Sequence, residues 1–149
     1  MRAIHLLLPA LLLSGSAFAA EKTDVMVPLH QFVDGFNKGD VKSALAACAS
    51  PAYIIDEFAP YQWSGANACA DWANDYEKNA KANGITDGVV KILKATTVDV
   101  SGDHAYVIAR TSYDWKEKGK AMHEKSATLT AALHKEAAGW RMTAWTWSK

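Results

Sequence analysis

The sequence lacks an excess of either charge and has only one long apolar run. Its 16 lysine and arginine residues balance 16 aspartate and glutamate residues, without a basic block. Nucleic-acid binding depends on clustered positive charge that neutralises phosphates, so we expect no nucleic-acid partner. The apolar run, Ile4–Leu13, is about ten residues long and too short to cross a bilayer core of about 30 Å as a helix. We therefore expect no membrane association once this segment is removed.

Motifs that mark metal, phosphate or nucleophile chemistry are also missing. His30, His123 and His134 show none of the short spacings that form a metal site from sequence neighbours. The chain has no glycine-rich phosphate loop, CxxC motif or serine nucleophile elbow. We therefore expect no metal and no cofactor. A metal site assembled from residues distant in the sequence is the alternative that this argument leaves open.

The first nineteen residues have the pattern of a secretory signal peptide. Arg2 precedes the apolar run, Ser14-Gly15-Ser16 interrupts it, and Ala17-Phe18-Ala19 has the small-x-small pattern of a cleavage site. We expect cleavage after Ala19 and export to the periplasm. Residues 20–149 then have a length suited to one domain.

Apolar stripes with helical spacing predict three helices in the first half of the remaining chain. Asp24 can begin the first, which should end at Asn37-Lys38-Gly39. Asp40 can begin a short second helix, with Cys48 on its buried face. Ser64 can begin a third, which carries Cys69 inward and stops at Gly84.

Two cysteines, Cys48 and Cys69, enter an oxidising compartment if the chain is exported. Because both lie on predicted core faces of neighbouring helices, we expect them to form a disulfide. The alternative is a pair of buried free thiols.

In the second half of the chain the apolar pattern changes to the period of two that is typical of strands. A short strand-like run, Ala52–Phe58, lies between the second and third helices. We expect the longer strands at Val89–Val100, His104–Trp115, His123–Lys135 and Trp140–Trp147. This order predicts an α+β fold in which the helices pack on one face of an antiparallel sheet.

Three segments carry a more specific signal: FVDGFNKGDVKSALAACASPAYIIDEF, VDVSGDHAYVIAR and HKEAAGWRMTAWTWS. Together they resemble the NTF2-like superfamily in its SnoaL-like branch, over about Val25 to Ser148. The resemblance implies a cone, with three N-terminal helices packed on a curved antiparallel sheet around a pocket. It also implies frequent pairing into homodimers. Members include isomerases, dehydratases, hydrolases and proteins without catalysis, so the resemblance does not imply a reaction.

Within this superfamily, the ketosteroid isomerases can be laid on the chain from Phe32 to Trp72 without a gap. Their general-base aspartate then falls on Asp56. Their two oxyanion donors fall on Phe32 and near Ala131, neither of which can donate a hydrogen bond from its side chain. Losing one such donor typically costs about 3 kcal/mol of transition-state stabilisation, which disfavours steroid isomerisation.

Asp56 is the candidate catalytic residue. It shares a strand face with Ile54 and Phe58, whereas the adjacent Glu57 should point outward. An aspartate among apolar residues is either a pocket carboxylate with a raised pKa or a structural carboxylate that caps the Ala59-Pro60 turn. Both interpretations stay open at this point.

An unusual number of aromatic residues comes from the segments that should surround the cone, and Tyr61 and Trp63 precede the third helix, where they could form a rim. We expect the pocket to be lined by Phe32, Phe36, Phe58, Tyr61, Trp63, Trp72, Tyr76 and Trp145. The charged residues Arg110 and Asp114 share a strand face that we assign to solvent.

The last strand alternates Trp140 and Met142 with Trp145 and Trp147, so a strict period of two places bulky apolar residues on both faces. We therefore expect a homodimer through the outer face of the sheet. The sequence favours an exported protein that binds a small apolar or aromatic molecule. Two alternatives remain: an enzyme of isomerase, dehydratase or hydrolase type that uses Asp56 as acid or base, and a structural module with a filled cone.

Overall fold

The computed structural model describes residues 14–149, so most of the predicted signal peptide, residues 1–13, lies outside the described range. In chain order the elements are α1 (Ser14–Asn37), α2 (Val41–Leu45), β1 (Cys48–Ile55), β2 (Gln62–Gly65), α3 (Ala68–Asn83), β3 (Ile85–Ser101), β4 (His104–Glu117), β5 (Lys120–Glu136) and β6 (Gly139–Ser148). None of the helices in this range has the length and hydrophobicity needed to cross a membrane.

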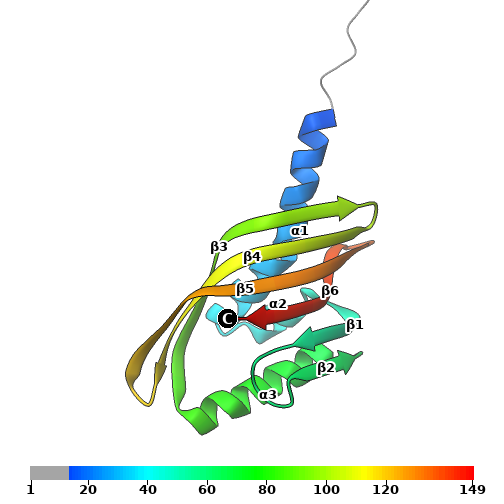
Figure 1. The fold of residues 1–149 in the computed structure, drawn as a ribbon. Coiled ribbons are helices and arrows are strands. Elements are labelled where there is room, and N and C mark those ends of the chain that lie inside the picture. The colour runs from blue at the N-terminus through cyan, green and yellow to red at the C-terminus, as the bar shows by residue number, and fades with distance from the viewer. Residues whose placement is uncertain (1–13) are drawn as a thin grey trace, which may run out of the picture.

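The six strands form one curved sheet in the order β2-β1-β6-β5-β4-β3 (Figure 1). β1 and β6 run parallel, and the other neighbours run antiparallel. The prediction of an antiparallel sheet with three N-terminal helices was therefore wrong in two respects. The sheet is mixed, because β6 inserts beside β1 rather than at an edge. The helices are only partly N-terminal, because β1 and β2 precede α3.

Helix α1 also begins earlier than predicted, because the helical backbone extends upstream of Asp24 to Ser14. The buried side chains Val25, Leu29 and Phe32 place one side of the helix against the core. Gly35 allows close packing on α2: a Cβ at this position would lie 2.8 Å from the Ala44 Cβ and 2.7 Å from its backbone nitrogen.

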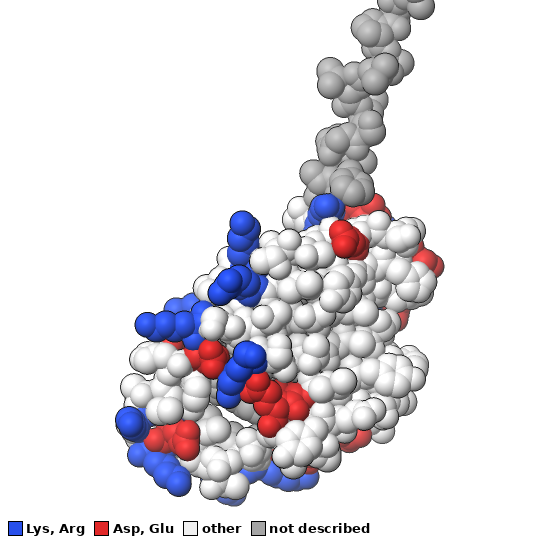
Figure 2. Space-filling view, in the orientation of Figure 1, with Lys and Arg blue, Asp and Glu red and all other residues white. Residues whose placement is uncertain are grey.

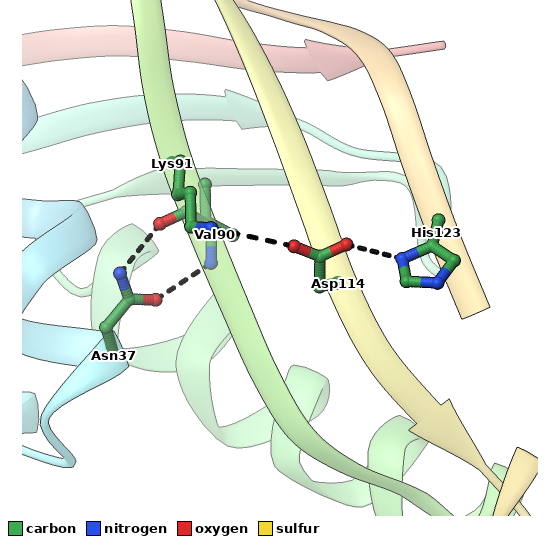
Figure 3. A network of polar contacts seen from close by, with 5 residues as sticks. All are labelled: Asn37, Val90, Lys91, Asp114 and His123. Carbon is green, nitrogen blue, oxygen red and sulfur yellow. Dashed lines mark hydrogen bonds and ion pairs between the residues drawn. The ribbon is translucent and has the colours of Figure 1, made fainter. Parts of the chain in front are cut away.

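At the C-terminal end of α1, Asn37 ties the helix to strand β3. Its Nδ2 donates to the carbonyl oxygen of Val90 at 2.7 Å, and its Oδ1 accepts from the Val90 N–H at 2.9 Å (Figure 3). The amide thus satisfies both backbone groups of one residue at the free edge of the sheet.

A bulge in β6 sets the direction of four large side chains. Ala132 pairs with Ala144, but the next residue, Leu133, pairs with Met142, so Thr143 is an extra residue in β6. Trp140, Met142 and Trp145 are consequently all buried, and Trp147 packs against the same core. The expectation that these residues alternate between the two faces was wrong, because the bulge shifts the alternation by one residue.

Strand β3 is irregular along its length, with register shifts against β4 after Thr86, after Ile92 and after Ala95. Each extra residue bends a strand and increases its twist. Figure 1 shows β3, β4 and β5 bending together around the helices.

The predicted disulfide between Cys48 and Cys69 is confirmed, with the two Cα atoms 6.6 Å apart. Its setting differs from the prediction, because α2 ends at Leu45 and Cys48 begins β1. The bond therefore joins the sheet to the first turn of α3. Closing a loop with a sequence separation of 21 stabilises the fold by about 3 kcal/mol on the chain-entropy argument.

Candidate functional site

A cavity of about 560 Å³ lies between α1, α3 and the concave face of the sheet. Its wall contains six of the aromatic residues that we assigned to a pocket from the sequence: Phe32, Phe36, Phe58, Trp72, Tyr76 and Trp145. Tyr113, Trp115 and Trp147 also line it, although the sequence argument did not include them. A second depression follows the outer side of α1 beside Met26 and Val27. Among residues 14–149 only α1 lines it.

Trp72 is the centre of the aromatic wall. Its ring lies 5.5 Å from that of Phe32 and 4.8 Å from that of Trp145, and it stacks on Tyr76 at 5.6 Å. Phe36 and Phe58 close the cluster at 5.3 and 6.5 Å from Trp72. Such contacts add roughly 0.5–1.5 kcal/mol per pair to the effect of burial, so the wall is fixed before any ligand binds.

Asp56 lies one residue beyond the end of β1 and reaches the cavity. Its Oδ2 accepts from Trp72 Nε1 at 2.8 Å, and its Oδ1 accepts from the Glu57 backbone N–H at 2.7 Å. Burial raises the pKa of the Asp56 carboxyl above its usual value, and these hydrogen bonds offset the rise only in part. The turn is closed by the backbone instead, since the Asp56 N–H donates to the carbonyl of Tyr61 at 3.1 Å.

A pair of tyrosine hydroxyls forms a second polar group in the cavity. The hydroxyl oxygens of Tyr76 on α3 and Tyr113 on β4 are 2.7 Å apart. Burial raises the pKa of both phenols, so both stay protonated at neutral pH. One hydroxyl must donate to the other, which leaves the second proton free to donate elsewhere. Gly88 makes room for this pair, because a Cβ there would lie 2.8 Å from the Tyr113 hydroxyl oxygen.

Charged residues stand at the edge of the cavity. The Glu57 carboxylate accepts from the backbone N–H of Lys149 at 2.8 Å and pairs with its Nζ at 3.0 Å. Lys116 pairs with Asp87 at 2.9 Å, on the neighbouring strands. Figure 2 shows a hollow in this face of the molecule with acidic and basic side chains beside it. The interior is thus apolar with a few polar groups, and the rim is charged.

Two residues assigned to the pocket lie elsewhere. Trp63 is buried beneath Phe58, at 5.0 Å between ring centroids, and its Nε1 donates to Asp75 at 3.0 Å. Tyr61 is 60% exposed in the turn between β1 and β2. The rim that we expected from these two residues is therefore absent from the cavity wall, because strand β2 turns Trp63 toward α3.

The positions that correspond to oxyanion donors carry no hydrogen-bonding side chain. Phe32 is part of the aromatic wall, and Ala131 is buried opposite Trp145 in the register of β5 and β6. The Tyr76–Tyr113 pair lies on α3 and β4, at neither of these positions. The alternation of β4 places Tyr113 on the face opposite Asp114, but it does not show that Tyr113 meets Tyr76.

Asp114 and Arg110 lie on the outer face of the sheet, away from the cavity. The Asp114 carboxylate is bonded to His123 Nδ1 at 2.6 Å and lies 4.0 Å from Lys91 Nζ (Figure 3). All of these side chains are exposed or half-exposed. They form a surface cluster with no access to the cavity.

This geometry can hold an apolar molecule and offer it two kinds of polar contact. Asp56 can exchange a proton, because its raised pKa brings it closer to the operating range of a general acid or base. The tyrosine pair can donate a hydrogen bond. Among the described residues, one group of three side chains could bind a metal, and it lies at the end of β4 and β5 that is far from the cavity.

The sequence matches the SnoaL-like domain family over residues 25–148. The chain therefore belongs to the SnoaL-like family, which confirms the resemblance seen in the sequence. No curated protein matches the chain.

Solved structures with the same fold are distant in sequence. A ketosteroid isomerase-like protein from Erwinia carotovora atroseptica superposes with a TM-score of 0.65 at 18% identity, covering 87% of this chain and 95% of that one. An NTF2-like protein from Novosphingobium aromaticivorans gives 0.69 at 16% identity, covering 89% and 83%. An NTF2-like superfamily protein from Salmonella enterica gives 0.71 at 12% identity, covering 88% and 92%. These similarities establish the fold.

The raised pKa of Asp56 predicts how Asp56→Asn changes stability with pH. A raised pKa in the folded state means that the wild type loses stability as pH rises from about 3.9 through the folded value, whereas the amide does not titrate. The stability advantage of the wild type over Asp56→Asn should thus be greatest near pH 4 and smaller at pH 8. Urea denaturation of both proteins at the two pH values measures it.

Asp75→Asn on α3 is the matched control. The hydrogen bonds from Lys78 and Trp63 lower the pKa of Asp75, so its contribution is present at pH 8 and lost on acidification. The stability advantage of the wild type over Asp75→Asn should therefore be smaller near pH 4 and greater at pH 8. An Asp56 advantage that grows between pH 4 and pH 8 would contradict the buried-carboxylate interpretation.

Proposed function

We propose that this protein is an exported SnoaL-like pocket protein that binds a small apolar or aromatic molecule. The observation that carries the proposal is the cavity of about 560 Å³ with its wall of aromatic rings. Small-molecule sites typically have volumes of about 300–1,000 Å³, with apolar walls and a few polar groups that orient the ligand. Asp56 and the tyrosine pair are such groups.

A second candidate function is catalysis with Asp56 as general acid or base. It is favoured by the raised pKa of a carboxyl that reaches the cavity and by the nearby hydroxyl pair of Tyr76 and Tyr113. Isomerisation through a dienolate is disfavoured, because one oxyanion donor falls on Phe32 and the other falls near Ala131, where the inward-facing side chains are apolar.

The proposal of export has two supports. The N-terminal sequence has the pattern of a cleavable signal peptide ending at Ala19. The disulfide between Cys48 and Cys69 is of the kind that forms and persists in oxidising compartments.

We also propose that two copies pair through the outer face of the sheet. The four tryptophan and methionine residues of β6 no longer support this, since all face inward. The support is instead an uncharged surface across β1, β6, β5 and β4. Tyr53, Ala144, Ala132 and Tyr106 are successive partners across these strands, and Ile55, Thr146, Thr130 and Ile108 form the next row.

Exposed side chains make this surface apolar at both ends. Tyr53 and Ile55 are 57% and 59% exposed at the β1 end, and Tyr106 is 44% exposed at the β4 end. An uncharged area that continues over four strands fits an identical surface, as a two-fold dimer requires. A stable pair would bury on the order of 1,200 Å² or more in total.

Filling the cavity should abolish ligand binding while leaving the fold intact. Ala80 on α3 lines the cavity, so Ala80→Trp should remove a molecule that copurifies with the wild type. Ala82→Trp on the same helix is the control, because Ala82 is exposed and lies outside the cavity wall. Native mass spectrometry of protein purified from its own host measures the ligand. A ligand retained equally by Ala80→Trp would contradict the pocket assignment.

The same experiment separates binding from catalysis through Asp56→Asn. If the protein only binds, the wild type and Asp56→Asn release the same compound. If Asp56 catalyses a reaction, the wild type releases a substrate and a product on prolonged incubation, whereas the variant releases substrate alone.

The exported protein should begin at Ala20 and contain no free thiol. Intact-mass analysis of the protein recovered from the periplasmic fraction, with alkylation before and after reduction, measures both. A chain that begins at Met1 in that fraction, or one alkylated at Cys48 and Cys69 without reductant, would contradict the proposal.

Sedimentation velocity at micromolar concentration should show a dimer. Ile55→Lys should shift it to the monomer, because the charge would be buried without a partner. Leu93→Lys is the matched control, since Leu93 is 56% exposed but lies in a bulge of β3 outside the two uncharged rows. A wild-type monomer, or equal dissociation of both variants, would rule out this interface.

A further inference from the structure

A cluster of two histidines and an aspartate lies at the end of the sheet where β3 turns into β4. Asp103 is in the turn, His104 is the first residue of β4, and His134 is near the end of β5. His104 and His134 are direct partners across the two strands, and their rings are 4.9 Å apart. Asp103 and His134 are 31 positions apart in the sequence, so no spacing motif marks the group.

The carboxylate of Asp103 contacts both histidine side chains. Asp103 Oδ1 is 2.7 Å from His104 Nδ1, and Oδ2 is 3.3 Å from His134 Nε2. One ligand atom from each residue lies within 4.8 Å of the other two. A tetrahedral zinc ion with bonds of about 2.0–2.1 Å needs ligand atoms about 3.3 Å apart. Small rotations of the three side chains can bring the ligand atoms from their present separations to the separation that zinc requires.

We propose that Asp103, His104 and His134 bind a divalent transition-metal ion, with Zn²⁺ as the representative. Imidazole nitrogens suit zinc, copper and nickel, whereas magnesium and calcium prefer sites made of oxygen atoms. Three protein ligands leave at least one coordination position for water.

The backbone holds the ligands in place before an ion binds. The N–H of Lys135 donates to the carbonyl oxygen of Asp103 at 2.8 Å, which ties the turn to β5 next to His134. The pairing of His104 with His134 fixes the remaining two positions. Binding therefore requires side-chain adjustment but no refolding.

The site is separate from the cavity. Tyr113, Trp115 and Glu117 of β4 border the cavity, whereas His104 is at the opposite end of that strand. A bound ion would join the β3–β4 turn to β5 and take no part in chemistry at Asp56. Arg141 pairs with His134 in the register of β6, and its positive charge on the same face opposes that of the ion.

Isothermal titration calorimetry with ZnCl₂ tests the proposal, using untagged protein at pH 7.5. We expect one Zn²⁺ per chain, and a melting temperature that rises with zinc concentration, because the ion binds the folded state. His104→Gln and His134→Gln should each weaken binding by about tenfold or more. MgCl₂ at the same concentrations should give no binding heat.

His123→Gln is the matched control. His123 on β5 is also hydrogen-bonded to an aspartate, with its Nδ1 2.6 Å from Asp114 Oδ1 on β4. No second histidine among the described residues joins His123 and Asp114 in a group of three ligands. The substitution of His123 should leave zinc affinity unchanged. The proposal is overturned if the wild type does not bind Zn²⁺, if His104→Gln or His134→Gln binds it as tightly as the wild type, or if His123→Gln weakens binding equally. Circular dichroism confirms that each variant is folded.

Discussion

The indole of Trp72 touches three parts of the fold at once, because α3 carries it into the space between α1, the end of β1 and β6. Its faces and edges pack on Phe32, Tyr76 and Trp145, and its N–H donates to Asp56. Burying an indole N–H without an acceptor is costly, and burying a carboxylate without a donor is more so. The hydrogen bond therefore stabilises both groups, and it places an ionisable side chain in an aromatic wall.

The same residue connects stability to function. Its apolar contacts hold α3 against the sheet, and its single donor supports the charged form of the carboxyl that burial disfavours. The disulfide at Cys69 holds the same end of α3, one turn before Trp72. The cavity is thus the space between the sheet and a helix that is anchored near its N-terminal end, and its shape follows from where the helix is held.

Much of this could be predicted from the sequence, and the exceptions have physical causes. The four long strands and α3 agree with the period of the apolar residues, since burial on one face dictates that period. The parallel pairing of β1 with β6 was not predicted, because a period of two says nothing about which strand lies beside which. The bulge at Thr143 reversed the expected faces of Trp145 and Trp147, and a single extra residue leaves no signal in composition.

The residues of the candidate site were also predicted only in part. Most aromatic residues of the wall were among those expected, because apolar stripes on helices point to a common interior. Asp56 was singled out in another way, because the general base of the ketosteroid isomerases falls on this position. Trp63 was misplaced because the short strand β2 was not recognised. The partnership of Tyr113 with Tyr76 depends on the curvature of three strands, which no local pattern records.

The amide of Asn37 has a consequence for the solubility of the protein. Strand β3 is the outermost strand of the sheet and 17 residues long, and an unpaired edge of that length invites another chain to add a strand. By taking both backbone groups of Val90, Asn37 occupies the place that an incoming strand would use. The irregularities of β3 interrupt the edge further along. The contact that holds α1 in place therefore also protects the sheet against edge-to-edge aggregation.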